Sequence, residues 1–421
     1  MMANNLETLE QRQPAQRNAD LLAGLNKALT HAKAHAPYYA EALAALPAGG
    51  LTSLEQLASL PVTRKSDLSA QQSAKPPLGG MLAVPPTALR RIFQSPGPIY
   101  EPQGMAIDVF RTARALRAAG FAAGDLVHNS FSYHLSPGAW IMEGGLHALG
   151  CWVLPAGVGQ TELQAQAMAQ LQPAGYVGTP SFLKLILEKA DELGLSVSSL
   201  RKAAVSGEAL TPSMREWFAS RGLTSMRSVY ATADLGMIAY EGADPSQGMI
   251  IDEEIVLEIV EPGGSQPMPL GETGEVVVTH FGSDYPMIRF ATGDLSAIDP
   301  ASVDLPSVCG RTNLRIKGWL GRADQTTKVR GMFVHPGLVA AIVRRFPQIT
   351  KARLVLTGRL GEDVMTLRCA LAEGIERSDD LRVQIADSVR DVTRLRGEVG
   401  FASANDLPDD GKLIEDARDY R

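Results

Sequence analysis

The sequence predicts an α/β protein: a large N-terminal domain of parallel α/β layers with an antiparallel β subdomain, then a small α+β C-terminal domain. Three observations lead to this fold class. Strand-like and helical runs alternate from about residue 105 to 240, separated by short glycine-containing turns. Strand-like runs follow one another over 249–297, with turns such as PGG and PLGETG between them. After residue 321, helical and strand-like runs mix over about 100 residues, which is enough for a separate domain.

The composition is that of an ordinary globular protein. Of 421 residues, 45% are hydrophobic and 20% are charged, which excludes disordered, collagen-like and fibrous chains. The 40 Lys and Arg residues against 46 Asp and Glu residues give a net charge of −6. No basic excess marks a nucleic-acid-binding face, so no nucleic-acid partner is expected.

The N-terminal part of the chain is expected to be helical. Residues 15–45 have leucines at three- and four-residue spacing from Leu21 to Leu29 and read as helical. A short helix is expected in LTSLEQLASL, ended by Pro61, and Thr63 can cap the helix that follows.

The central region supplies the parallel layers, because parallel strands need crossover connections such as helices. The expected elements are helix 107–120, strand 125–131, helix 140–150, strand 151–157, helix 162–172, strand 175–179, helix 181–194, strand 202–207, helix 212–222 and strand 226–232. The antiparallel subdomain is expected to contain strands 249–261, 274–282 and 286–298.

The C-terminal region reads as helix, two strands, helix and strand. The expected elements are helix 336–346, strands 351–358 and 363–373, helix 378–397 and strand 398–403. The longer helix is amphipathic, with one apolar stripe made of Leu381, Ile385, Val389 and Val392. The change of pattern at 321–325 divides the chain into domains 1–321 and 322–421.

Three widely spaced cysteines, Cys151, Cys309 and Cys369, form neither a disulfide framework nor a zinc motif. The N-terminus has no apolar signal core, and no run reaches the roughly 18 apolar residues of a membrane-spanning helix. A cytoplasmic protein without a membrane partner is expected.

Polar residues follow two neighbouring expected strands. Ser206, Gly207 and Glu208 end one strand, and Tyr230 and Asp234 end the next. Ligands of parallel α/β sheets lie outside the carboxyl ends of the strands. Tyr230 can stack on a flat base, and Asp234 can hold a divalent cation. Taken alone, an ordinary βα turn and a core tyrosine with a helix-capping aspartate are the alternatives.

Two later segments add candidates. Thr292, Gly293 and Asp294 read as a tight turn after a strand, where an aspartate can accept hydrogen bonds from both hydroxyls of a ribose. Arg322 and Asp324 lie where the pattern changes, and the planar Arg fork can meet a ribose or a phosphate. A plain turn and an ion pair between domains are the alternatives.

Taken together and in this order, these segments resemble the adenylate-forming superfamily of acyl-CoA synthetases, luciferases and peptide-synthetase adenylation domains. The likeness is greatest to the phenylacetate–CoA ligase branch and runs along nearly the whole chain. It includes HAKAHAPYYAEAL, LTSLEQLASLPVTRKSDL, VGQTE, GTPSF, CGRT and GRADQTTKVRGMFVHP.

The resemblance implies an acid–CoA ligase-like enzyme that uses ATP to convert a carboxylic acid, expected to be an aryl acid, to an acyl-adenylate and then transfers the acyl group to CoA. It implies ATP, AMP, Mg²⁺ and CoA as ligands, with a small carboxylic acid as substrate. It also implies that the C-terminal domain is mobile. A homodimer stays open.

The resemblance also implies individual roles. The nucleotide-binding residues would be Ser206, Gly207, Glu208, Ala209, Tyr230, Ala231, Thr232, Asp294 and Arg322. Asp234 would be the metal-binding acid, and Tyr133 and His134 would line the acyl pocket. Asp324 would be the hinge, and Lys412 would neutralise charge on the attacking carboxylate and the α-phosphate.

Two histidines have simpler alternatives. His134 can be a hydrogen-bonded turn residue, and His280 is expected to be structural.

Segment 91–104 departs from the family's phosphate loop, which is rich in Ser, Thr and Gly and ends in Lys. Only Ser95 and Gly97 remain, and three prolines remove amide donors. Glu101 stands in the place of the lysine, so the segment is expected to repel polyphosphate. Asp234 replaces a usual glutamate, which keeps the charge.

Three functions therefore stay open. The first is a ligase that holds pyrophosphate with other groups. The second is a degenerate nucleotide- or acyl-binding protein without turnover, and the third is an adenylating enzyme with an acceptor other than CoA. In each, the nucleotide is expected to lie between the large and small domains, held by Asp234, Asp294 and Lys412.

Overall fold

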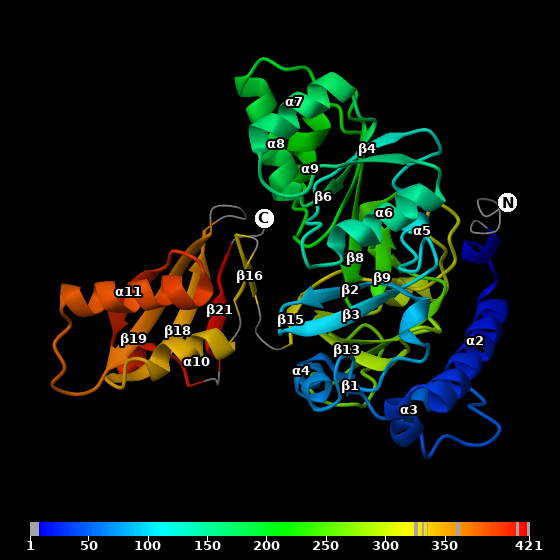
Figure 1. Cartoon of the computed structure of the whole chain (residues 1–421), viewed down its shortest axis with the longest axis horizontal. Helices are drawn as coiled ribbons and strands as arrows, with labels where there is room; N and C mark the ends of the chain where they lie inside the picture. Colours follow the sequence, from blue (N-terminus) through cyan, green and yellow to red (C-terminus); the bar gives the residue numbers. More distant parts are fainter. Residues whose placement is uncertain are drawn as a thin grey trace. The chain divides into compact units, whose positions relative to one another are not determined.

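The computed structural model describes residues 8–323, 327–330, 332–334, 336–358, 363–409 and 412–418. The chain divides into two compact units, Met1–Gly321 and Arg322–Arg421 (Figure 1). None of the described helices has the length and the apolar run needed to cross a bilayer.

An eight-stranded sheet is the centre of the first unit. Its strands are β4 (Leu126–Asn129), β5 (Trp152–Pro155), β6 (Gly175–Gly178), β7 (Lys202–Val205), β8 (Ser225–Thr232), β9 (Gly236–Glu241), β10 (Met249–Ile251) and β14 (Arg315–Ile316). The order is β14-β10-β9-β8-β7-β6-β4-β5. The five strands β4 to β8 run parallel, as predicted, and the other three continue the sheet antiparallel.

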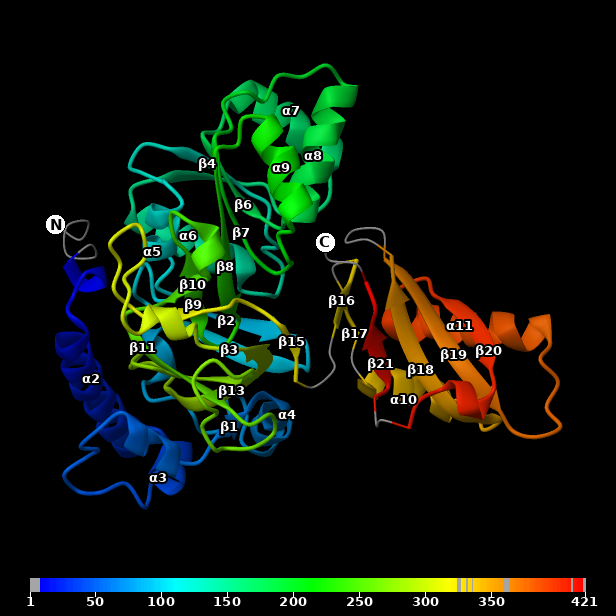
Figure 2. The ribbon, with the colours of Figure 1, turned by 180° about the vertical axis from the view of Figure 1, so that it is seen from behind.

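Helices cover both faces of the parallel part (Figures 1 and 2). The helices are α5 (Ala113–Ala118), α6 (Gly138–Ala148), α7 (Thr161–Leu171), α8 (Pro180–Glu192) and α9 (Pro212–Ser220). Successive residues of a strand point to opposite faces. Accordingly, Tyr176 packs with α7, α8 and α9, whereas Val177 packs with α5 and α6. The alternating pattern of residues 105–240 thus folds as the predicted α/β layers, although α5 is shorter than the expected helix 107–120.

A second, five-stranded sheet contains β1 (Thr63–Arg64), β11 (Ile255–Val260), β12 (Gly274–His280), β13 (Met287–Ser296) and β15 (Gly321–Arg322). The order is β1-β13-β12-β11, and β15 also pairs with β13. Strands β11, β12 and β13 are antiparallel, as expected. The prediction of a single strand over 249–261 is wrong. The turn at Asp252–Glu254 divides this segment into β10 and β11, which lie in different sheets.

The N-terminal helices pack on this second sheet. The expected helical run 15–45 is two helices, α2 (Pro14–His35) and α3 (Pro37–Ala42), whose Leu25 and Tyr39 are fully buried in the core. The break falls before Pro37 because proline has no amide hydrogen to continue the ladder and disfavours helical geometry in the residue before it.

The helix that follows begins one residue later than predicted. It is α4 (Lys65–Ala74), and its N-cap is Arg64, not Thr63. Thr63 instead pairs with Phe290 in the sheet. Short 3₁₀ helices are η1 (Glu55–Ser59), in the expected helix LTSLEQLASL, η2 (Pro86–Ala88), η3 (Pro245–Gln247), η4 (Pro300–Ser302) and, in the second unit, η5 (Ala404–Asp406).

The segment compared with a phosphate loop forms a hairpin. Strands β2 (Leu89–Ser95) and β3 (Ile99–Gly104) are antiparallel, with Ser95 opposite Ile99. The three-residue connection Pro96–Pro98 has only one backbone amide, that of Gly97, because proline lacks the donor.

The second unit is α+β. A four-stranded sheet has the order β20 (Glu398–Ala402), β19 (Val364–Leu371), β18 (Ile349–Thr357), β21 (Ile414–Asp416). The helices α10 (Pro336–Arg344) and α11 (Asp379–Thr393) lie on one face of it (Figures 1 and 2), and Ile385 and Val389 of the predicted stripe are fully buried. A separate two-stranded sheet pairs β16 (Thr327–Val329) with β17 (Met332–Val334).

His280 of β12 has the surroundings of a structural residue. Its Nδ1 accepts a hydrogen bond from the backbone N–H of Gly282 at 2.9 Å. Burial, assisted by the Arg111 guanidinium, lowers the pKa of His280 from 6.5 to about 3.

This lowered pKa predicts a loss of stability in acid. The unfolded chain binds a proton on His280 below pH 6.5, whereas the folded protein resists it until about pH 3. The group's contribution is therefore present above pH 6.5 and is lost as pH falls, by roughly 1–3 kcal/mol. His280→Asn keeps an acceptor without a titrating ring. Its thermal stability is expected to fall less than that of the wild type on acidification; parallel pH profiles would contradict this reading.

Candidate active site

The polar residues expected at the ends of parallel strands lie at the same edge of the sheet. In the parallel ladder Asn129 pairs with Val177, Gly178 with Val205, and Val205 with Ser228. The loops after β4, β6 and β7 and the end of β8 therefore emerge on the same side. This is the side on which open α/β sheets bind ligands.

The turn after β7 is held in a fixed shape. Gly207 has φ +81°, the left-handed region that favours glycine. The backbone N–H of Ser206 donates to the carbonyl of Gly178 at 3.2 Å. Glu208 accepts a hydrogen bond from the hydroxyl of Ser181. These contacts attach the turn to the end of β6 and the first turn of α8, and the next residue, Ala209, is half-buried.

Tyr230 and Asp294 are brought into contact from two sheets. The Tyr230 hydroxyl donates to Asp294 Oδ2 at 2.9 Å, and Trp319 Nε1 donates to Asp294 Oδ1 at 3.1 Å. Trp319 was missed by the sequence analysis, where the segment GWLG served only to mark the domain boundary. An indole in a short segment between Gly318 and Gly321 was the available signal.

Asp294 lies inside β13, not in a turn after a strand, so that expectation is wrong. Glu275 and Val277 of β12, two residues apart, pair with Leu295 and Ala291, four residues apart. The extra residues form an irregularity of the ladder, and Gly293 within it has φ +74°. Such bulges bend a strand and redirect a side chain next to functional sites.

Asp234 lies in the turn between β8 and β9, with its side chain fully buried. Its Oδ2 is 2.5 Å from Nζ of Lys65, the first residue of α4. Sequence analysis missed Lys65, because the charged run TRKSD was considered only for helix capping. Ala231 and Thr232, the residues before this turn, are half-buried, and Thr232 Oγ1 accepts the backbone N–H of Leu235 at 3.2 Å.

Glu101 of β3 belongs to the same group of charges. It is 2% exposed, and Ser95 donates its hydroxyl hydrogen to Glu101 Oε1. Burial, and then the Asp234 carboxylate, raise the pKa of Glu101 to about 8, against the opposing effects of Ser95 and Lys65. A raised pKa means that a second negative charge beside Asp234 is disfavoured, which weakens the repulsion of polyphosphate expected from Glu101.

The remaining phosphate-loop residue, Gly97, is exposed in the hairpin connection. It stands between two prolines and offers the only amide there. The hairpin thus lacks the row of backbone donors that cradles phosphates.

Tyr133 follows β4 at the same sheet edge and is tightly held. Its hydroxyl accepts a hydrogen bond from Asn129 Nδ2 at 3.0 Å and donates to Glu143 Oε2 at 2.5 Å. Its ring meets Trp140 edge to face, 5.0 Å between centroids. Burial and the Glu143 carboxylate raise the pKa of Tyr133 above its usual value. His134 is exposed.

The remaining candidates belong to the second unit. Arg322 is half-buried at the start of the unit, and Lys412 is exposed just before β21. Asp324, the expected hinge, lies outside the described residues.

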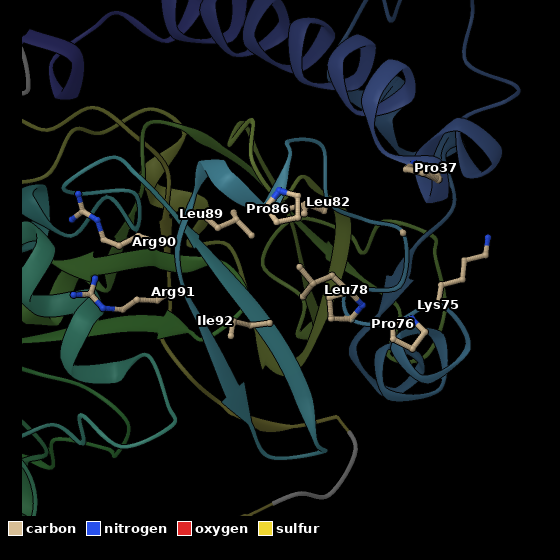
Figure 3. A pocket seen from close by; sticks show the side chains of 12 residues that line it. Pro37, Lys75, Pro76, Leu78, Leu82, Pro86, Leu89, Arg90, Arg91 and Ile92 are labelled. Carbon is tan, nitrogen blue, oxygen red and sulfur yellow. The ribbon is translucent and has the colours of Figure 1, made fainter.

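A cavity of about 490 Å³ lies elsewhere, between α3, the chain at 75–82 and the start of β2 (Figure 3). Its lining is mostly apolar, and none of the predicted residues that the structure describes belongs to it. Figure 3 shows the side chains of Arg90 and Arg91 extending away from Leu78 and Pro76. Arg91 instead lies over the Trp140 ring, 3.8 Å from its centroid.

No set of three or more His, Cys, Asp or Glu residues in the described part of the chain can hold a metal ion by itself. Mg²⁺ needs fewer protein ligands when it arrives with phosphates, because one or two carboxylates then suffice. Asp234 fits this use, because its Oδ1 is buried and has no hydrogen-bond partner in the described structure.

Sequence comparison connects this site with a known family. A model of AMP-binding enzymes matches residues 108–282. The phenylacetate–CoA ligase of Pseudomonas putida is 30% identical over 345 residues, which cover 78% of this chain and 76% of that protein. The phenylacetate–CoA ligase of Escherichia coli strain K12 is 29% identical over 394 residues, covering 89% and 87%.

Structural comparison agrees along the whole chain. A crystal structure of 2-hydroxyisobutyryl-CoA ligase, in complex with 2-HIB-AMP and CoA, has a TM-score of 0.83 at 25% identity and covers 98% of this chain and 92% of that chain. An amide bond synthetase from Marinactinospora thermotolerans, at 16% identity and a TM-score of 0.59, covers 78% and 68% and shares the fold.

Proposed function

Because the chain belongs to the AMP-binding enzyme family, in its phenylacetate–CoA ligase-like branch, we propose that it activates a carboxylic acid with ATP and transfers the acyl group to CoA. The observation that carries this proposal is the contact between Tyr230 and Asp294, which joins a flat aromatic ring and a ribose acceptor at the ligand-binding edge of the sheet. The relatives named phenylacetate–CoA ligase and 2-hydroxyisobutyryl-CoA ligase support the same reaction class.

The reaction has two steps. A carboxylate oxygen of the acid attacks the α-phosphorus of ATP, and the bond from that phosphorus to the bridging oxygen breaks, releasing pyrophosphate. The sulfur of CoA then attacks the acyl carbon, AMP leaves with the electron pair of the carbon–oxygen bond, and the thiol proton passes to solvent. The products are one acyl-CoA, one AMP and one pyrophosphate per ATP.

The first unit would bind the nucleoside. Tyr230 offers its ring to adenine, with Ser206–Ala209 and Ala231–Thr232 beside it. Asp294 would accept the ribose hydroxyls. Its two oxygens already accept from Tyr230 and Trp319, but each carboxylate oxygen has a second lone pair, so these two bonds can position it.

Lys65 would supply the cation that the hairpin lacks. It lies at the start of α4 beside Asp234, and a lysine there can leave its carboxylate partner for a phosphate oxygen as a mobile point charge. Asp234 would hold Mg²⁺, which neutralises phosphate charge when bound.

The second unit would serve both half-reactions. Lys412 would stabilise the charge that builds during adenylation, Arg322 would assist at the ribose, and Asp324 would be the hinge for the change between steps, as the resemblance implies. In the first unit Tyr133 would line the acyl pocket, with His134 at its exposed rim. An aryl acid remains the proposed substrate class.

Product analysis tests the proposal. The protein is incubated with ATP, Mg²⁺, CoA and single acids from an aryl and aliphatic panel, and acyl-CoA and AMP are measured by mass spectrometry. Equal amounts of acyl-CoA and AMP are expected with at least one acid. AMP release that needs no CoA and yields another acyl product would favour a different acceptor. Tight AMP binding with no product from any acid would favour a binding protein without turnover.

Two variants of Tyr230 test the adenine assignment. Tyr230→Phe keeps the ring and is expected to change the AMP dissociation constant by less than about threefold, whereas Tyr230→Ala should weaken AMP binding by about tenfold or more, because base–aromatic stacking is lost. Calorimetric titration measures both constants. Equal weakening by Phe and Ala would assign the effect to the hydroxyl and remove the stacking role.

A further inference from the structure

We propose that Glu101 is a second carboxylate ligand, together with Asp234, for the magnesium ion that accompanies ATP. By this route the hairpin that lacks a phosphate-loop lysine would still contribute to phosphate binding, through a metal ion that acts alongside the Lys65 cation. The inference rests on the proposed function, because it needs a nucleotide that arrives with Mg²⁺.

The first support is a pair of buried oxygens. Among the side chains that the structure describes, only five buried polar atoms have no hydrogen-bond partner, and two of these are Glu101 Oε2 and Asp234 Oδ1. Both residues are more than nine-tenths buried, at 2% and 7% exposure. Buried polar atoms almost always have a partner, so two such oxygens, on carboxyl groups close enough to interact electrostatically, indicate that a ligand completes them.

The second support is the way the other two oxygens are held. Ser95 donates to Glu101 Oε1, and Lys65 donates to Asp234 Oδ2 at 2.5 Å. One oxygen of each carboxyl group is thereby fixed and the other is left over. Hydrogen bonds from a second layer commonly orient metal-binding carboxylates in this manner. Ser95, one of the two phosphate-loop residues that the hairpin retains, would thereby position the Glu101 carboxylate.

The third support is the charge balance. Two adjacent carboxylates repel each other, and Lys65 compensates for only one of them. A divalent ion would compensate for the excess and would bring phosphate oxygens and water as its remaining ligands, the arrangement that Mg²⁺ favours. A proton shared between Glu101 and Asp234 is the rival explanation, and it predicts no metal ligand at Glu101.

Manganese binding separates the two explanations. Mn²⁺ is titrated into protein saturated with α,β-methylene-ATP, and the bound ion is measured by electron paramagnetic resonance. Glu101→Gln is expected to weaken Mn²⁺ binding in this complex by about tenfold or more, as loss of a ligand requires, and Asp234→Asn should do the same. The matched control is Asp108→Asn, since burial also raises the pKa of Asp108, to about 6, but both of its carboxylate oxygens already accept backbone hydrogen bonds at the start of α5.

Unchanged Mn²⁺ affinity in Glu101→Gln would overturn the inference and favour the shared proton. The glutamine amide can donate a hydrogen bond to Asp234 in place of that proton, but it removes the carboxylate that would bind the metal ion. If Glu101→Gln does not fold, Glu101→Asp provides the test. Its carboxylate is one methylene shorter, and a Mn²⁺ affinity or spectrum identical to that of the wild type would equally overturn the inference. Loss of Mn²⁺ binding in Glu101→Gln together with no acyl-CoA from the wild type would refute the proposed function and leave the metal site standing.

Discussion

Replacement of Lys412 by alanine is expected to lower the rate of acyl-adenylate formation by about 100-fold or more, because a positioned cation stabilises charge that develops in the transition state. The second half-reaction should be spared, since thioester formation from supplied acyl-adenylate builds no charge on an attacking carboxylate. Lys412 is exposed, so the fold should tolerate its loss. Single-turnover assays of each half-reaction measure the two effects separately.

Arg390→Ala provides the control for Lys412. Arg390 is an exposed cation of the same unit, on α11, with a side chain that is 61% exposed. It should leave both half-reactions unchanged. If Lys412→Ala impairs both halves equally, or neither, the role assigned to Lys412 is wrong.

Lys65→Met is expected to reduce adenylation by about 100-fold or more, because it removes the cation beside the Asp234 site. It should also destabilise the protein by about 3 kcal/mol, since the fully buried Asp234 carboxylate loses its ion pair with Lys65. Calorimetry or urea unfolding measures the stability. The rate of pyrophosphate release, followed by stopped flow, measures adenylation.

The double variant Lys65→Met/Asp234→Asn separates these two effects. Removing both charges should recover most of the lost stability, because no uncompensated charge then remains buried. Activity should stay low, since neither the cation nor the carboxylate is restored. Activity that returns together with stability would show that Lys65 acts only through folding.

Local pattern was enough to predict the layered part of the fold. The alternation of strands with helices, together with the glycine turns, placed β4 to β8 in one parallel sheet. This was possible because the spacing of apolar residues that marks a helix or a strand is visible within a few neighbouring residues. Strand β9 was missed. Its six residues are all buried, so they show no alternation of polar and apolar side chains that would mark a strand.

Contacts between distant segments explain what was missed in the site. Lys65 and Asp234 are 169 residues apart, and Tyr230 and Asp294 are 64 apart. No local spacing relates such pairs, so the sequence supplied Tyr230, Asp234 and Asp294 as separate candidates from separate segments, and only the family likeness joined them. The ion pair of Asp234 with Lys65 became visible only when the chain was folded.

The charge state of Glu101 shows a further limit. Its place, where the family's phosphate loop has a lysine, suggested an ionised group that repels polyphosphate. Burial and the neighbouring Asp234 weaken that expectation, because both raise the pKa of Glu101. A side chain's charge in a folded protein depends on desolvation, which a sequence pattern does not contain.

Acid-dependent exchange of labelled pyrophosphate into ATP tests most directly whether this chain activates carboxylic acids despite its altered hairpin. With Mg²⁺ and a panel of aryl and small aliphatic acids, label should enter ATP with at least one acid, without CoA, and not in the absence of acid. Saturable AMP binding with no exchange for any acid would contradict activation and leave a protein that only holds the nucleotide.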